Sequence, residues 1–212
     1  MIASAAPETT VPREEQKLQD KARQVYSLAK LPQESLSAEV FCLPEYTRNI
    51  LEKMATAINT EGPISKNLLC KRVLQSYGIA RMGSRLERRF DDLLKKIHVP
   101  TTTHKAVKYF WSANLAPSSY RIFRVPENEG ERRTAGDLPP EEVACAVYYV
   151  LQNQLSMSQE DLVREVYKEL GYSRSGSAVE QAMLDGIGYA KKNDKISIYS
   201  DGIVSLQNRE KT

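Results

Sequence analysis

The chain has 212 residues, of which 41% are hydrophobic and 27% charged, and a formal net charge of +3. This composition is typical of a globular protein with room for one large or two small domains. No apolar run approaches the roughly 20 residues that a membrane-spanning helix needs. The first residues, Met1–Pro12, lack the basic and apolar parts of a signal peptide, so we expect a cytoplasmic protein.

Few side chains are suited to redox or metal chemistry. The three cysteines, Cys42, Cys70 and Cys145, are far apart and have apolar neighbours, which favours reduced, buried thiols over a disulfide framework. The two histidines, His98 and His104, belong to no paired spacing that a zinc site would use. We expect neither a metal nor a cofactor.

Four segments are predicted along the chain. Residues 1–40 are expected to form a tail or an upstream connection, with one possible short helix over Arg13–Ala29. Residues 41–113 and 138–212 are expected to be two copies of one unit, called here the first and second repeat. Residues 114–137 contain two prolines and two glycines among mixed charges, which predicts an irregular linker.

The repeat is visible as an ungapped alignment of two stretches. Ile64–Glu87 matches Met157–Glu180 at an offset of 93 residues, with the shared pattern Gly-x-x-Arg-x-Gly-Ser-x-x-Glu. Upstream of it, apolar residues recur every four positions in both copies, as one face of a helix requires. These residues are Ile50, Met54 and Ile58 in the first copy, and Val143, Val147 and Leu151 in the second. Each copy is therefore predicted to begin with an amphipathic helix, which follows a Leu-Pro pair.

Two further helices are predicted in each repeat. The second helix begins near Ser65 or Ser158 and ends at the first glycine of the shared pattern, where a left-handed cap fits. The third begins at Ser84 or Ser177, each followed three residues later by a glutamate, which is the capping-box pattern. Its predicted buried side chains are Leu86, Phe90, Leu93 and Ile97 in the first repeat, and Val179, Met183 and Ile187 in the second.

β-Like sequence follows each third helix. In the second repeat, Ile196–Leu206 alternates around an Asp-Gly turn, a strong hairpin signal. In the first, Ile97–Val99 and Val107–Trp111 flank a threonine-rich loop. The predicted fold class is mainly α with small β-hairpins (α+β), arranged as tandem winged-helix-like domains. A three-helix bundle with an unrelated hairpin is the alternative.

These motifs resemble a known family, the domain of unknown function 3320, over roughly residues 40–208. The specific features are Glu61-Gly-Pro-Ile64, Gly78-Ile-Ala-Arg-Met-Gly-Ser-Arg85, Arg132-Arg133 before Leu138-Pro-Pro-Glu-Glu142, and Gly171-Tyr-Ser-Arg-Ser-Gly176. Members occur towards the C-terminus of large superfamily 1 helicase proteins, many of which also carry a restriction-endonuclease-like domain. The resemblance implies an accessory module of a DNA-translocating machine, with a helicase or nuclease partner. It implies no catalysis here, because the chain lacks a phosphate-binding loop.

Charge is distributed unevenly between the repeats. Residues 44–111 hold thirteen Lys and Arg against six Asp and Glu, which gives +7, whereas residues 138–212 hold eight against eleven, which gives −3. Because phosphate neutralisation supplies most non-specific affinity for DNA, DNA contact is predicted for the first repeat. The candidate DNA-binding residues lie just before or on its third helix and on its hairpin; they are Arg81, Ser84, Arg85, Arg88, Arg89, Lys95, Lys96, Lys105 and Lys108.

Two alternatives weigh against parts of this set. The third helix could be a solvated face whose cations pair with Asp91 and Asp92. Arg81 recurs as Arg174 in the acidic repeat, which favours a structural role for both, binding carbonyls at the end of the second helix.

No catalytic constellation is found in the sequence. The adjacent pairs Asp91-Asp92 and Glu141-Glu142 lie on helices, so the two carboxylates of each pair point in different directions. The sequence therefore predicts a non-catalytic nucleic-acid-binding accessory module. A protein–protein adaptor, and a fragment of an enzyme whose helicase activity resides in other domains, are the alternatives.

Overall fold

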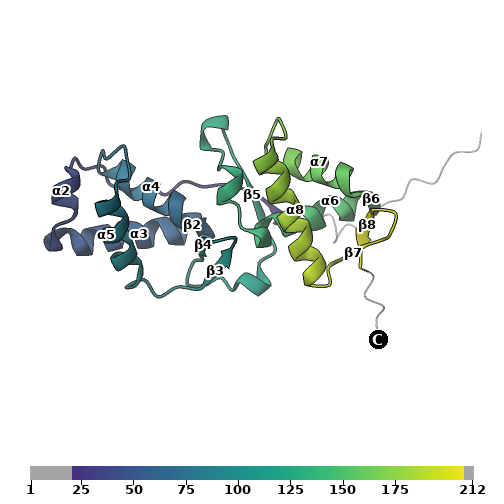
Figure 1. The fold of residues 1–212 in the computed structure, drawn as a ribbon, viewed down its shortest axis with the longest axis horizontal. Coiled ribbons are helices and arrows are strands. Elements are labelled where there is room, and N and C mark those ends of the chain that lie inside the picture. Colours follow the sequence, from purple (N-terminus) through teal and green to yellow (C-terminus); the bar gives the residue numbers. More distant parts are fainter. Residues whose placement is uncertain (1–20, 208–212) are drawn as a thin grey trace, which may run out of the picture.

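The computed structural model describes residues 21–207. Its buried side chains form two hydrophobic clusters, one in each repeat. Phe110 belongs to the first cluster and the next residue, Trp111, to the second, as neighbours in an extended chain point to opposite sides. Figure 1 shows the corresponding two groups of helices at the two ends of the molecule, with a hairpin and a short strand between them.

The first repeat contains three main helices and a three-stranded antiparallel sheet of strand order β2-β4-β3. Its elements in chain order are α2 (Ala38–Phe41), α3 (Thr47–Glu61), β2 (Ile64–Ser65), α4 (Lys66–Ser76), α5 (Ser84–Leu94), β3 (Thr101–His104) and β4 (Val107–Phe110).

Apart from α2, the second repeat has the same order of elements, and its sheet has the corresponding strand order, β6-β8-β7. Its elements are α6 (Pro140–Gln154), β6 (Ser156–Ser158), α7 (Gln159–Glu169), α8 (Ser177–Lys192), β7 (Ile196–Ile198) and β8 (Ile203–Leu206). The starts of α3 and α6, of α4 and α7, and of α5 and α8 are each 93 residues apart, so the predicted register is confirmed through the helices. The offset grows to 96 at β4 and β8, since α8 is longer than α5. The fold is α+β, mainly helical with small hairpins.

The predicted apolar faces of the first helices are confirmed. Ile50, Met54 and Ile58 of α3 are at most 1% exposed, and their counterparts in α6 are equally buried. In α8, Gly186 lies so close to α6 that an added Cβ would come within 2.3 Å of the Val143 side chain. Glycine is needed there because the two helices pack at close range.

The predicted C-terminal caps of α4 and α7 are present, but the predicted N-terminal caps of α5 and α8 are not. Gly78 and Gly171 follow α4 and α7 with φ of +71° and +83°, the left-handed caps that were predicted. The capping boxes predicted at Ser84 and Ser177 are wrong. A glycine precedes each serine in extended conformation, so the serine already lies inside the helix and its side chain caps nothing.

Serine caps are present one helix earlier in both repeats. The Oγ of Ser65 accepts a hydrogen bond from the Leu68 amide (3.0 Å), and the Oγ of Ser158 accepts one from the Asp161 amide (3.1 Å). Each bond satisfies an amide that has no partner inside the helix. The duplicated serine caps therefore begin α4 and α7.

The first hairpin lies elsewhere than predicted. The threonine-rich stretch, expected to be a loop, is strand β3, and the chain turns at Lys105-Ala106, whose φ angles of 45° and 68° are both positive. β-Branched threonines favour a strand, whereas Ile97–Val99 forms an irregular segment packed on the first core. The second hairpin is as predicted, with Gly202 at φ +81° in the turn.

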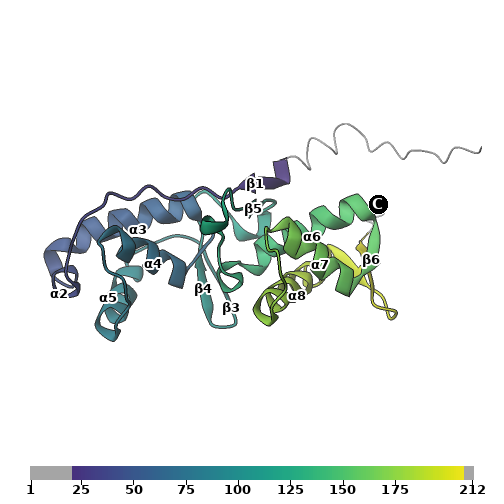
Figure 2. The same ribbon diagram turned by 90° about the horizontal axis from the view of Figure 1, so that it is seen from above.

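The segments outside the repeats are more ordered than predicted. Strand β1 (Arg23–Val25) pairs in parallel with β5 (Phe123–Val125), which lies in the predicted linker. The helix expected over Arg13–Ala29 is thus wrong from residue 23 on; residues 13–20 lie outside the described part. After β1 the chain runs along α3 to α2 (Figure 2). The linker itself contributes the buried side chains of Tyr120, Phe123, Val125 and Ala135 to the second core.

Candidate nucleic-acid interface

Helix α5 has one buried face and one exposed face. Leu86, Phe90 and Leu93 recur at helical spacing and are at most 3% exposed, so they anchor the helix in the first core. Between them, Arg85 and Arg88 are exposed on one side, three residues apart. Lys95 and Lys96 continue the same side just beyond the last turn, and Arg81 is exposed in the preceding loop. These five cations, Arg81, Arg85, Arg88, Lys95 and Lys96, are called the α5 basic face.

Acidic neighbours neutralise little of this face. Asp92 pairs with Lys95 at 2.8 Å, but both side chains are mostly exposed, and such pairs are weak. Asp91 pairs with Lys66 of α4 rather than with an arginine of α5. Within residues 21–207, Arg85, Arg88 and Lys96 take part in no ion pair. The sequence alternative was that the cations of this helix pair with Asp91 and Asp92. Among the five cations of the α5 basic face, only Lys95 forms such a pair.

The structural role expected for Arg81 is not seen. Both Arg81 and its counterpart Arg174 are exposed, and neither guanidinium donates a hydrogen bond to a helix carbonyl in the described part of the chain. The glycine caps already satisfy these carbonyls: the amide of Ile79 bonds to Leu74 O, and that of Tyr172 to Tyr167 O. An arginine is not needed there.

Two predicted contact residues are occupied by other parts of the molecule. Arg89 points inward, where its Nη2 donates to Leu43 O at 3.1 Å and to Thr47 Oγ1 at 2.7 Å. It fastens α5 to the start of α3. The Lys105 ammonium, at the tip of the first hairpin, lies 2.6 Å from the Asp185 carboxylate of α8. Both side chains have partners within the chain, so we leave Arg89 and Lys105 out of the α5 basic face, although the Lys105 side chain is still 54% exposed.

The first hairpin docks on the second repeat instead of projecting from the first. Besides Lys105, His104 contacts Asp185, with 2.9 Å between its Nε2 and Oδ2. The hairpin also lies near α8 in Figure 1. Lys108 on β4 remains exposed. Ser84 is exposed as the first residue of α5 and stays a candidate phosphate contact.

A buried ionic cluster joins the two repeats, and sequence reasoning did not identify it. The carboxylate of Glu142 on α6 is fully buried and accepts hydrogen bonds from Arg124 and Arg133 at 2.6–3.1 Å. Arg124 also donates to three carbonyls at the end of α3 and in the next turn, those of Glu61, Gly62 and Pro63. Burial alone would raise the pKa of Glu142, but the two guanidiniums lower it below its usual value.

This cluster gives a physical role to motifs quoted above. Gly62 is needed because an added Cβ would lie 2.4 Å from Ile58 O. The Tyr26 ring packs under Arg133, with 4.3 Å from ring centre to Cζ, and so ties the N-terminal segment to the cluster. The Arg132-Arg133 and Glu141-Glu142 pairs were the sequence signals for this cluster. Of these residues, only Arg133 and Glu142 take part in its hydrogen bonds.

The described residues offer little that could act as a nucleophile or hold a metal. Cys70 and Cys145 are buried, and burial raises the pKa of each thiol to about 12. Cys42 is a half-buried thiol. Between residues 21 and 207, no three metal-ligating side chains come together. None of the helices in this range is long and apolar enough to cross a membrane.

Comparison with known proteins gives one family. Residues 39–88, from α2 into α5, match the model of a family described as "Protein of unknown function (DUF3320)". The match covers α3 and α4, ends within α5, and is shorter than the expected span of residues 40–208. No curated protein matches the chain. Through its first repeat, the chain resembles the DUF3320 family of proteins of unknown function.

Proposed function

We propose that the chain is a non-catalytic nucleic-acid-binding module and that its first repeat contacts DNA through the α5 basic face. The observation that supports this most directly is the placement of Arg85 and Arg88 on one exposed side of a helix, with no acidic side chain at ion-pair distance from either among the described residues. Clustered, unpaired cations on a helix neutralise phosphates. The charge of +7 over residues 44–111 extends the attraction beyond these contacts.

Each repeat is proposed to be a winged-helix-like unit, in which the third helix enters the major groove. The order helix, strand, helix, helix, hairpin and the pairing of the short strand with the hairpin favour this assignment. The β3–β4 hairpin corresponds to the wing of such a unit. Because this hairpin contacts Asp185, α5 rather than the hairpin would make the main DNA contacts.

The link to a helicase is inferred from the resemblance alone, and the location from the composition of Met1–Pro12. We propose an accessory module of a superfamily 1 helicase-type DNA-processing protein, with a helicase or nuclease partner, in the cytoplasm. The matched family carries no described activity, and the buried thiols favour a role without catalysis.

The test is a fluorescence-anisotropy titration of the full chain with labelled duplex DNA. The double variant Arg85→Glu/Arg88→Glu should lose at least about tenfold in affinity, because two phosphate contacts become repulsive. The matched control is Lys191→Glu/Lys192→Glu at the exposed end of α8, which changes the net charge by the same amount. Equal losses in both variants would show that only net charge matters, and no loss in either would refute the proposed surface.

A further inference from the structure

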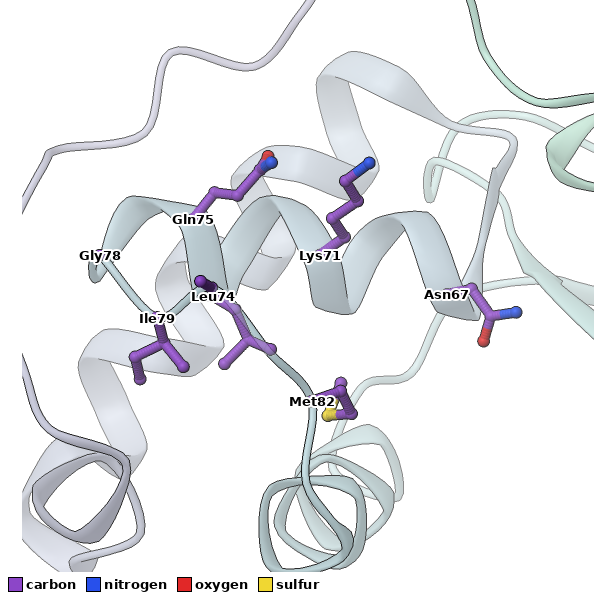
Figure 3. Close-up of a pocket in the computed structure, with 8 residues that line it drawn as sticks. Asn67, Lys71, Leu74, Gln75, Gly78, Ile79 and Met82 are labelled. Atoms are coloured by element: carbon purple, nitrogen blue, oxygen red, sulfur yellow. The ribbon is translucent and has the colours of Figure 1, made fainter.

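A groove of about 620 Å³ lies on the first repeat between α4 and the loop that leads to α5. Figure 3 shows Lys71 and Gln75 along one side of α4 and Leu74, Ile79 and Met82 on the other. Met82 is 43% exposed and lies beside the apolar side chains of Leu74 and Ile79 in the groove lining. The groove thus combines an apolar floor with a single cation on its rim.

The second repeat has a groove of about 450 Å³ at the equivalent place. At the 93-residue offset, Lys71 corresponds to Arg164 and Met82 to Ser175. Arg164 is ion-paired with Glu160 and Asp161, at 3.4 and 3.1 Å. Lys71, by contrast, takes part in no ion pair within residues 21–207. Both grooves have an apolar lining, since Val163, Tyr167 and Leu184 line the second. They differ in charge, because the arginine of the second groove is ion-paired and, in the described part of the chain, the lysine of the first is not.

We propose that the groove of the first repeat is a docking site for an acidic peptide segment of a partner protein, which inserts one large apolar side chain. The floor of Leu74, Ile79 and Met82 receives the apolar side chain, and the flexible methionine adapts to its shape. Lys71 pairs with a carboxylate beside it.

Charge complementarity selects this occupant. Residues 44–111 carry a charge of +7, so they repel a basic segment and attract an acidic one. Phosphate binding makes no use of an apolar floor, so the groove is distinct in chemistry from the α5 basic face. The inference is independent of DNA binding by α5.

The test uses a random peptide library displayed on phage, selected on the full chain. The selected peptides should carry Asp or Glu next to one Leu, Ile, Met, Phe or Trp. A synthetic copy of one of them should bind the Lys71→Glu and Met82→Ser variants about tenfold more weakly, the loss typical of a central contact residue. Binding to Arg164→Glu, the matched change in the second groove, should be unchanged. Both first-groove residues are exposed or on a rim, so the variants should keep the wild-type fold by circular dichroism.

Several results would overturn the proposal. Selected peptides that are basic, or that bind both groove variants as tightly as wild type, would place the binding elsewhere. Self-association of the chain that the same variants abolish would make a second copy the occupant. A loss of duplex affinity in Lys71→Glu/Met82→Ser as large as that in Arg85→Glu/Arg88→Glu would assign the groove to the nucleic-acid surface.

Discussion

Replacing Glu142 by Gln should destabilise the protein severely. The carboxylate is fully buried and accepts five hydrogen bonds from the amide and guanidinium of Arg124 and the guanidinium of Arg133. Glutamine has the same shape but leaves two buried cations without their anion and points an amide donor at them. Breaking a buried ion pair in this way costs about 3–5 kcal/mol of unfolding free energy. For a chain of this size, that corresponds to a fall in Tm of roughly 6–20 °C.

Urea unfolding and thermal melts of the full chain would measure this loss. The matched control is Glu141→Gln, the adjacent residue of α6, whose Oε2 is buried without a hydrogen-bond partner in the described structure. Its neutralisation should change the free energy by no more than about 1 kcal/mol, because no strong pair is broken. A Glu142→Gln protein within 1 kcal/mol of wild type, or equal losses in both variants, would refute the argument that the cluster holds the repeats together.

Three further predictions concern packing, acid and thiol reactivity. Gly186→Ala should lower the free energy of unfolding in urea by about 1–3 kcal/mol, because the added methyl group overlaps α6. Gly188→Ala, two residues on with open space around it, should raise that free energy by about 0.5–1 kcal/mol. The reverse order would contradict the helix packing. Since the folded state lowers the pKa of Glu142, its stabilisation should be complete above the ordinary value of 4.5 and decline as the pH falls below it. The Glu142→Gln variant should lack this part of the acid sensitivity, and identical pH profiles would argue against it. The half-buried Cys42 should react with a disulfide reagent in the native protein, and the buried Cys70 only at the unfolding rate; rapid labelling of Cys70 would contradict its burial.

Local patterns in the sequence were sufficient to predict the helices. The four-residue spacing of Ile50, Met54 and Ile58 identifies the buried face of α3, since only one face can contact the core. The left-handed glycines and the second hairpin likewise depend on short-range backbone preferences. The serine caps were predicted on the wrong helix, because Gly83 and Gly176 could adopt the extended cap conformation in place of the serines.

Contacts between distant residues could not be predicted in this way. Nothing near Arg124 in the sequence indicates that it binds both Glu142 and carbonyls some 60 residues earlier. The same holds for the ion pair between Asp185 and Lys105, a predicted DNA contact whose pairing 80 residues away the sequence does not indicate. Of the candidate interface, the sequence indicated which residues are charged, and the fold indicates which of them face solvent.

The salt dependence of duplex binding tests the central claim most directly. Each phosphate contact contributes a slope of about −0.9 to the plot of log affinity against log salt concentration. The full chain carrying Arg85→Ala/Arg88→Ala should therefore show a slope flatter than wild type by about 1.8, measured by anisotropy at several salt concentrations. The Lys191→Ala/Lys192→Ala control should keep the wild-type slope. An unchanged slope in the α5 variant, or the same flattening in the control, would contradict DNA binding by the α5 basic face.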